Sequence, residues 1–411
     1  MRAMRHLVPG TREAAARLVQ WVRGNGWAGW DPYDVHAYLF RRRSFGERLA
    51  PGEEERILRR DGEDPLGLRR ELALRPTVNA KAMGLFLGAF AVLQAIGEVE
   101  CREEIEQTSR WLAENRSPDF PGAGWGYPFD WAGFAVFPAG TPTGVISCHV
   151  ADGFRAAHAL TGDPQWLDRC GEVAEFLLRG LNADDVPGRG RCFSYTPLDF
   201  FHVNNANLSA AETLLWTGRR LGRGEYVEAG LGALDFALGE FDGRGTLAYW
   251  ARGYEPEAGL RGFMDHYHTA AELRSLWRIG GLLPDRGDVA EAFQGYFEFY
   301  LREFFDAQAR PILRPGWDWL PFDIHAGAEA AYLLGMTLER EDSRGMLERF
   351  LPWFLENCRN EDGSFVHRLE RDGGGIRVRP IPFLRWGQAW TLRGLASVLE
   401  GLRTPGGEGR S

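Results

Sequence analysis

Residues 265–281, with the sequence DHYHTAAELRSLWRIGG, carry the pattern that decides the fold. Five polar or aromatic residues open the stretch. Ala270, Leu273 and Trp277 then recur at the three- and four-residue steps of one buried helix face. Polar side chains at a helix N-terminus lie where free backbone N–H groups favour anions. The segment therefore predicts a helix that begins in a polar site.

The same layout recurs along the chain with a spacing of roughly sixty residues. Helices rich in small residues are expected to begin near residues 77, 143, 204, 265, 323 and 385. Amphipathic second helices follow the first five of them, and then loops that contain glycine and aromatic residues. These second helices are expected at 104–115, 164–181, 224–241, 289–305 and 344–358. An internal repeat of this kind predicts helical hairpins packed side by side.

Six first helices and five second helices leave one partner missing. The helix expected at 12–23 can supply it, so that the hairpins close into a ring. We therefore predict an all-α (α/α)6 toroid with short β-hairpin loops, formed by residues 1–411 as a single domain. The helices rich in alanine and glycine should lie inside, because they must crowd at the axis. The charged segment 42–75 is expected to be a surface insertion, and an open helical solenoid is the alternative to a ring.

The unit length, the small-residue inner helices and the aromatic loops resemble the six-hairpin (α/α)6 toroid shared by many glycosidases and polysaccharide lyases. This resemblance covers nearly the whole chain. A second, local resemblance concerns residues 265–269, which are similar to the Tyr-His-Thr-containing helix start in the helical domain of glucuronyl C5-epimerases. The separate β-domain of those epimerases has no counterpart here. Both resemblances imply a carbohydrate substrate.

The composition excludes several other classes of protein. A net charge of -9 with mixed signs gives no basic stripe for nucleic acid, and no apolar run is long enough to span a bilayer. Five cysteines without a CxxC motif favour reduced thiols in the cytoplasm, and the charged N-terminus does not read as a signal peptide. Fifteen tryptophans are a high count, and tryptophan is a common platform for sugar rings.

Polar residues gather where the expected inner helices begin, and one asparagine or aspartate per helix would be enough for capping. Asp265 and Asp323 can be explained as N-caps alone, but the additional imidazoles, amides and arginine argue for a polar site. The loops before these helices also carry aromatic residues. The resulting substrate-binding candidates are Trp125, Tyr127, Asp130, Trp131, His149, Asp152, Asn204, Asn205, His266, Trp319, His325, Glu329, Arg385, Trp386 and Gln388.

Two kinds of sugar chemistry fit these residue types. Glycoside hydrolysis needs two carboxyl groups, for which Asp265 and Asp323 are the first candidates. Epimerisation or β-elimination at a uronate instead needs a tyrosine or histidine that moves the C5 proton, such as Tyr267 or His268, and a group that neutralises the carboxylate. The predicted catalytic residues are accordingly Asp265, Asp323, His268 and Tyr267.

The main prediction is a cytoplasmic carbohydrate-active enzyme with acid and base carboxylates in a central bowl. A uronate C5-epimerase or polysaccharide lyase and a non-catalytic toroid that binds a glycan or a protein are the alternatives. A terpenoid cyclase is disfavoured because the chain has no DxDD or DDxxD-like string. No metal and no obligatory cofactor are expected, since HExxH, zinc-finger, EF-hand and nucleotide-loop patterns are missing from the sequence. The sequence leaves the oligomeric state open.

Overall fold

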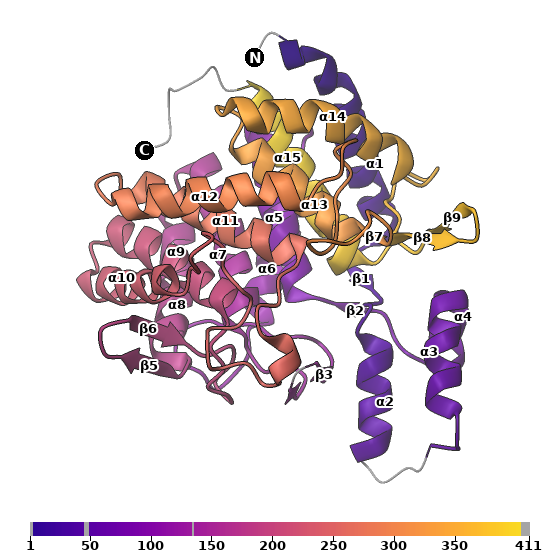
Figure 1. The fold of residues 1–411 in the computed structure, drawn as a ribbon, viewed down its shortest axis with the longest axis horizontal. Helices are drawn as coiled ribbons and strands as arrows, with labels where there is room; N and C mark the ends of the chain where they lie inside the picture. The colour runs from indigo at the N-terminus through magenta and orange to yellow at the C-terminus, as the bar shows by residue number, and fades with distance from the viewer. Residues whose placement is uncertain (1–2, 45–48, 134, 404–411) are drawn as a thin grey trace.

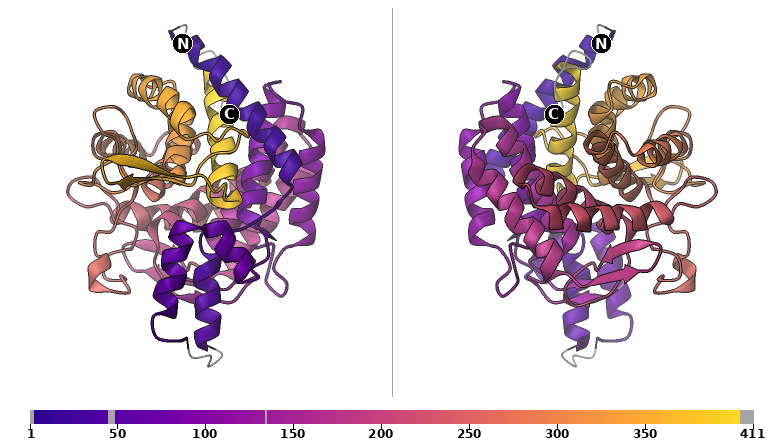
Figure 2. Two further views of the ribbon diagram at one scale, coloured as in Figure 1. Left: turned by 90° about the vertical axis from the view of Figure 1, so that its right-hand side faces the viewer. Right: turned by 90° about the vertical axis from the view of Figure 1, so that its left-hand side faces the viewer.

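The structure is a computed structural model that describes residues 3–44, 49–133 and 135–403. Six inner helices form a closed ring, because each contacts the next and the last contacts the first. They are α5 (Ala80–Ala95), α7 (Gly144–Thr161), α9 (Asn204–Leu221), α11 (His266–Leu282), α13 (Ile324–Met336) and α15 (Trp390–Arg403). The predicted (α/α)6 toroid is therefore confirmed, and the side views of Figure 2 show the yellow α15 between the orange helices near the C-terminus and the indigo and purple helices near the N-terminus.

A second layer of helices covers the outside of this ring (Figure 1). Five of them follow an inner helix in sequence: α6 (Arg102–Glu114), α8 (Pro164–Glu175), α10 (Gly224–Gly239), α12 (Gly287–Glu303) and α14 (Glu341–Asn357). Helix α1 (Leu7–Asn25) follows the short η1 (Ala3–His6) and packs against α14 and α15. Organisation of all 411 residues as one domain stays a prediction.

Small residues allow the inner helices to approach one another closely. A Cβ atom on Gly84 of α5 would lie 2.8 Å from the Cα of Val150 in α7. In the same way, a Cβ on Gly394 of α15 would lie 2.6 Å from the carbonyl oxygen of Ala328 in α13. Atoms cannot be accommodated at these separations. Alanine- and glycine-rich sequences therefore occupy the inner layer because larger side chains would force the helices apart.

Short strands close the loops at the ends of the hairpins. Antiparallel pairs join β1 (Ala28–Gly29) to β2 (Thr77–Val78), β3 (Trp131–Ala132) to β4 (Val136–Phe137), and β5 (Ala183–Val186) to β6 (Gly190–Phe193). Strand β8 (Arg368–Asp372) pairs with both β7 (Phe322–Asp323) and β9 (Gly375–Arg379). The loops also contain η3 (Ala258–Leu260) and two π-helical segments, η2 (Phe176–Gly180) after α8 and η4 (Leu384–Ala389) before α15.

A helical extension projects from the ring and includes most of the charged segment 42–75. It consists of α2 (Asp34–Ser44), α3 (Glu53–Glu63) and α4 (Pro65–Glu71), and Figure 1 shows it pointing away from the toroid. Val35, Leu39, Ile57 and Leu68 form a separate small core for it. Residues 45–48 of the predicted insertion lie outside the described residues.

Candidate functional site

The two aspartates predicted as acid and base both cap inner helices. The side chain of Asp265 accepts a hydrogen bond from the backbone N–H of His268 at 2.9 Å, and its other oxygen lies 2.8 Å from Nδ1 of the same residue. Asp323 accepts from the backbone N–H of His325. It also accepts from Arg368 Nε at 2.8 Å and from Trp386 Nε1 at 2.7 Å. Both residues are therefore N-caps, and Asp265 additionally orients a histidine.

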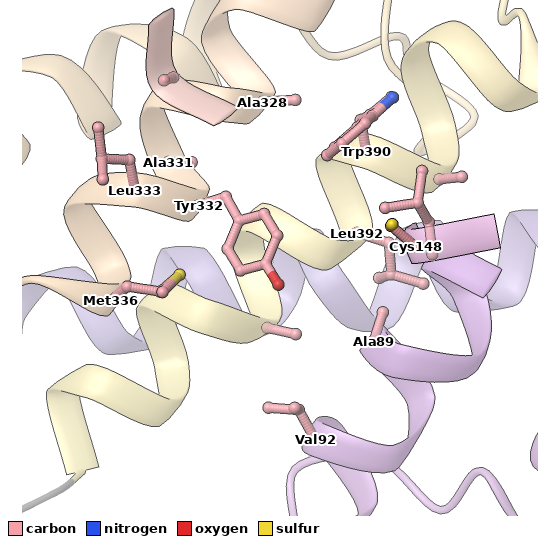
Figure 3. Close-up of a cluster of buried hydrophobic side chains, with 14 of the residues drawn as sticks. Ala89, Val92, Cys148, Ala328, Ala331, Tyr332, Leu333, Met336, Trp390 and Leu392 are labelled. Carbon is pink, nitrogen blue, oxygen red and sulfur yellow. The ribbon is translucent and has the colours of Figure 1, made fainter. Parts of the chain in front are cut away.

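A cluster of titratable side chains surrounds the indole of Trp390, near the N-terminal ends of the inner helices. The rings of His149 and His325 lie 4.9 and 4.8 Å from the Trp390 ring centre, and Lys81 Nζ lies 5.1 Å from it. Figure 3 shows Trp390 extending from α15 among buried side chains of the core. We refer to Lys81, His149, Tyr267, His325, Arg385, Trp386 and Trp390 as the central cluster.

The imidazole of His325 is held among aromatic rings. Tyr267 stacks on it with a centroid separation of 4.5 Å and an interplanar angle of 5°, and the Trp386 ring meets it edge-on at 4.7 Å. Neither ring nitrogen has a hydrogen-bond partner among the described residues. Burial, together with the nearby cations Lys81 and Arg385, holds the pKa of His325 well below its ordinary value of 6.5. His325 is therefore a neutral imidazole with an uncommitted lone pair.

A buried ion pair anchors one side of the cluster. Arg385, in the π-helical segment η4, donates from Nε and Nη2 to the two oxygens of Asp31 at 2.5 and 2.7 Å. Its guanidinium also lies over the rings of Tyr33 and Tyr127, 5.4 Å from each centroid. Burial alone would lower the pKa of Arg385, but Asp31 holds it above its ordinary value. The pair connects the loop after α1 to the start of α15.

A second bidentate pair lies deeper in the ring. Arg274 of α11 donates to both oxygens of Glu329 of α13 at 2.9 and 3.1 Å. Glu329 Oε1 is also 3.9 Å from Nε2 of His325, which is beyond hydrogen-bond range. Burial raises the pKa of Glu329, while Arg274 opposes the shift. This carboxylate is therefore committed to Arg274.

Further along the axis, a layer of arginines and carboxylates fills the ring. Asp152 contacts Arg155, Arg278 and Arg393 and accepts from the Tyr332 hydroxyl at 2.8 Å. Figure 3 shows the Tyr332 ring extending from α13 into the space between the helices. Burial alone would raise the pKa of Asp152, but the arginines hold it well below its ordinary value. The layer lines a cavity of about 30 Å³, close to the volume of one water molecule.

Among the other predicted binding residues, the loop aromatics Tyr127 and Trp131 lie near each other. Trp131 stacks on Tyr127 at 6.2 Å, and Tyr127 lies under Arg385 of the central cluster. Asp130 accepts from the backbone N–H of Ala139, and Arg41 of the helical extension lies 3.1 Å from its other oxygen. Asn204 donates to the carbonyl of Ala248. The side-chain oxygens of Asn204 and Asn205 are buried without a hydrogen-bond partner in the described part of the chain.

Four predicted residues make structural contacts instead. Trp125 donates to the carbonyl of Leu112, and Gln388 exchanges two hydrogen bonds with the backbone of Phe365. Trp319 packs edge-on against Trp353 of the outer helix α14. The fourth residue, His266, is enclosed between α11 and α12 by Tyr300, Phe304 and Phe305. Sugar contacts for these four stay predictions, and their packing gives those predictions no support.

His266 should make the stability of the protein depend on pH. Burial lowers its pKa to about 3, whereas the unfolded chain binds the proton near pH 6.5. Stability is therefore fully present above pH 6.5 and falls as the pH drops toward 3, by up to about 1.4 kcal/mol per pH unit. His266→Phe should remove this contribution. Denaturant unfolding of both proteins between pH 7 and 4 measures the difference. A difference that does not change with pH would contradict it.

Sequence reasoning missed several members of the site. Lys81, Arg274 and Trp390 lie within inner helices, on stretches that read as apolar core or solvated surface. Asp31 lies in a turn-rich stretch far from its partner Arg385 in sequence. A signal for Lys81 was present in the composition, because it is the only lysine of the chain.

In the part of the chain that the structure describes, no helix is both long and apolar enough to cross a membrane.

No family model matches the sequence, and no curated protein matches it either. Solved structures do resemble the fold. A GH76 α-mannanase from Bacteroides thetaiotaomicron aligns with a TM-score of 0.59 at 8% identity, covering 79% of this chain and 87% of that one. The cellobiose 2-epimerase from Bacillus thermoamylovorans gives 0.56 at 11% identity, over 77% and 87% of the two chains. A sugar epimerase from a ruminal bacterium gives 0.57 at 11% identity, over 80% and 88%. The chain is therefore an (α/α)6-toroid protein with the fold of these glycosidases and epimerases.

Proposed function

We propose that this protein is a carbohydrate-active enzyme that moves a proton at a sugar carbon next to a carbonyl or carboxyl group, as an epimerase does. The observation that carries the proposal is the uncommitted imidazole of His325, a neutral base at the centre of the ring. His149, whose ring meets Trp390 edge-on at 4.9 Å, also has its pKa held well below 6.5 by burial and by Lys81. Epimerisation removes a proton from one face of a carbon and returns one to the other face. A neutral imidazole can remove the proton, and an imidazole that has taken up a proton can return it.

The aromatic rings around His325 support a sugar ligand. Sugar rings present apolar C–H faces that pack on aromatic rings, and Tyr267 and Trp386 flank the imidazole. Both nitrogens of His325 are closed off from solvent, so side chains around the imidazole must move for a sugar to reach them. Two of the similar solved structures are named as epimerases of sugars. The substrate is accordingly proposed to be a mono- or oligosaccharide.

Glycoside hydrolysis is the second candidate. It is favoured by the GH76 α-mannanase among the similar structures and by the placement of Asp265 and Asp323 at the mouths of the neighbouring helices α11 and α13. The hydrogen bonds of Asp323 argue against it, because Arg368, Trp386 and a backbone N–H already occupy both oxygens. A general acid must present its proton to the substrate, and a carboxylate held this way cannot do so without rearrangement.

The deciding experiment separates carbon–hydrogen exchange from bond cleavage. The protein is incubated in D2O with a panel of neutral aldoses, disaccharides, uronates and uronate oligosaccharides. NMR then follows loss of the proton next to the carbonyl or carboxyl group, while a reducing-end assay follows hydrolysis. Exchange without new reducing ends is the expected result. New reducing ends without exchange would support hydrolysis, and binding without either reaction would support a non-catalytic toroid.

Asp265→Asn should abolish turnover while leaving the fold intact. The Asp265 carboxylate holds the His268 ring at 2.8 Å, and an amide can present its N–H to that nitrogen and change the tautomer. The capping bond to the backbone is retained, because asparagine also caps helices well. We expect the rate to fall by roughly 100-fold or more. The D2O assay measures the rate, and circular dichroism checks the fold. Unchanged activity would rule out Asp265 as an acid or base and also as the residue that orients His268.

A further inference from the structure

Lys81 differs in its chemistry from the arginines of this protein. The chain contains 48 lysine and arginine residues, and Lys81 is the only lysine among them. Arginine supplies a permanent positive charge but does not release its proton near neutral pH. Lysine can release a proton when its surroundings disfavour the charged form. The single amine side chain of the protein therefore lies in the central cluster, where arginine could have supplied charge alone.

The position of Lys81 is fixed by the start of helix α5. Its backbone N–H donates to the side chain of Asn79, the N-cap of that helix, at 2.9 Å. The residue is only 8% exposed, and its ammonium lies 5.1 Å from the centre of the Trp390 ring. Within residues 3–44, 49–133 and 135–403, the carboxylates that favour its charged form, Glu329 and Asp31, are ion-paired with Arg274 and Arg385. Lys81 is thus a buried cation without an ion pair of its own.

Charged and titratable groups from several elements influence Lys81. Arg385 of η4 and Arg274 of α11 disfavour its protonation, while Glu329 of α13 and Asp31 of the loop before α2 favour it. The two carboxylates already serve Arg274 and Arg385 through bidentate bonds. His149 of α7 and His325 of α13 are also close enough to be influenced by Lys81. Burial, then Arg385, lower the pKa of Lys81 to about 7.

We propose that Lys81 is a catalytic residue, the general acid that protonates the sugar's carbonyl oxygen while His325 removes the proton from the adjacent carbon. This inference rests on the proposed function. In the step, the C–H bond breaks and its electrons form a carbon–carbon double bond. The electrons of the carbonyl π bond take the ammonium proton. Lys81 becomes a neutral amine, His325 becomes an imidazolium, and the sugar becomes an enediol. The imidazolium of His325 then returns its proton to the carbon and the hydroxyl proton returns to Lys81, which restores both residues. Return of the proton to the opposite face of the enediol gives the epimer.

The geometry suits this division of roles. Lys81 and His325 approach the buried indole of Trp390 from different helices, so a sugar that enters between these helices can contact both side chains. A general acid works best when it holds its proton at the working pH and can also give it up there. Proton transfer to the oxygen avoids a buried carbanion, which would be costly in a site closed off from water. An arginine at position 81 could stabilise the oxyanion but could not complete the transfer.

The first test measures the amine directly and needs no substrate. Reductive methylation with ¹³C-formaldehyde labels the protein at one lysine and at the N-terminal amine, and Lys81→Arg identifies the lysine signal by its loss. We expect the lysine signal to titrate with a midpoint near 7. A midpoint near 10, the value of an exposed lysine, would overturn the proposal. Because this measurement is made on the unsubstituted protein, it holds even if a variant fails to fold.

The second test compares Lys81→Arg with Lys81→Met in the D2O exchange assay. If Lys81 supplies a proton, Lys81→Arg keeps the charge and KM within a few-fold but lowers kcat roughly 100-fold or more at pH 7. If the residue supplied only charge, Lys81→Arg would be as active as the unsubstituted protein and only Lys81→Met would fail, which would overturn the proposal. If no sugar exchanges with the unsubstituted protein, the proposed function fails. The amine titration still reports on Lys81 separately.

Discussion

His325→Gln is expected to reduce proton exchange by about 100- to 10,000-fold, the usual contribution of a positioned general base. Glutamine keeps a side chain of similar reach but cannot accept a proton at neutral pH. The imidazole accounts for the loss because its nitrogens have no hydrogen-bond partner among the described residues and its pKa lies well below 6.5. The D2O exchange assay measures the rate. Little loss of stability is expected, because no hydrogen bond from these nitrogens needs to be broken.

A matched histidine provides the control for this variant. His158 lies in α7, where its ring meets Trp216 edge-on, and it takes no part in the central cluster. His158→Gln should leave exchange unchanged. The profile of kcat/KM against pH adds a second check, because His325 must be neutral to act. Activity should therefore persist below pH 6, where an ordinary histidine would be protonated and inactive. Equal activity of the two glutamine variants would remove His325 from the mechanism.

Arg385→Met is expected to destabilise the fold by about 3–5 kcal/mol, because it leaves the carboxylate of Asp31 buried without its partner. Both side chains of this pair are at most 5% exposed, so water cannot replace the lost guanidinium. Denaturant unfolding measures the change in free energy. The effect should be large because Asp31 and Arg385 join the loop after α1 to the last inner helix, two segments that are distant in sequence.

Further variants test whether the unpaired carboxylate of Asp31 causes the loss of stability. The double variant Asp31→Ala, Arg385→Met removes both charges and should recover part of the lost stability. Arg191→Ala breaks an exposed pair with Asp185, whose side chain is 69% exposed, and should cost less than about 1 kcal/mol. Asp31→Ala alone completes the comparison. If the double variant loses as much stability as Asp31→Ala and Arg385→Met lose in sum, the two residues do not interact and the loss comes from packing alone.

The starts of the inner helices were predictable because they depend on local patterns. Five of the six expected positions lie within three residues of the first residue of α5, α7, α9, α11 and α13. The sixth expected start, at 385, falls in the π-helical segment η4, one residue after its start and five before α15. Aspartates and threonine at these mouths are recognisable caps, as Thr143 on α7 shows. The regular spacing of small and apolar residues then led to the ring.

The composition of the site was less predictable because a helix distributes neighbouring residues around its axis. His266 and Tyr267 are adjacent in sequence, but successive side chains on a helix point about 100° apart. Tyr267 therefore stacks on His325, whereas His266 faces the outer helix α12. The contacts of Lys81 with Trp390 and of Arg385 with Asp31 join segments that no local pattern connects. Only closure of the ring brings them together.

By itself, the sequence determined the hairpin repeat, the inner and outer layers and the polar helix mouths, because helix periodicity and capping act over only a few residues. The tertiary structure decided which polar groups meet and which become core. It paired Asp323 with Arg368 and Trp386, and Glu329 with Arg274, so these carboxylates are committed to other groups. It left His325 and Lys81 without such partners in the described chain. Pairing and burial depend on side chains from several helices at once, and these set the protonation state on which the chemistry depends.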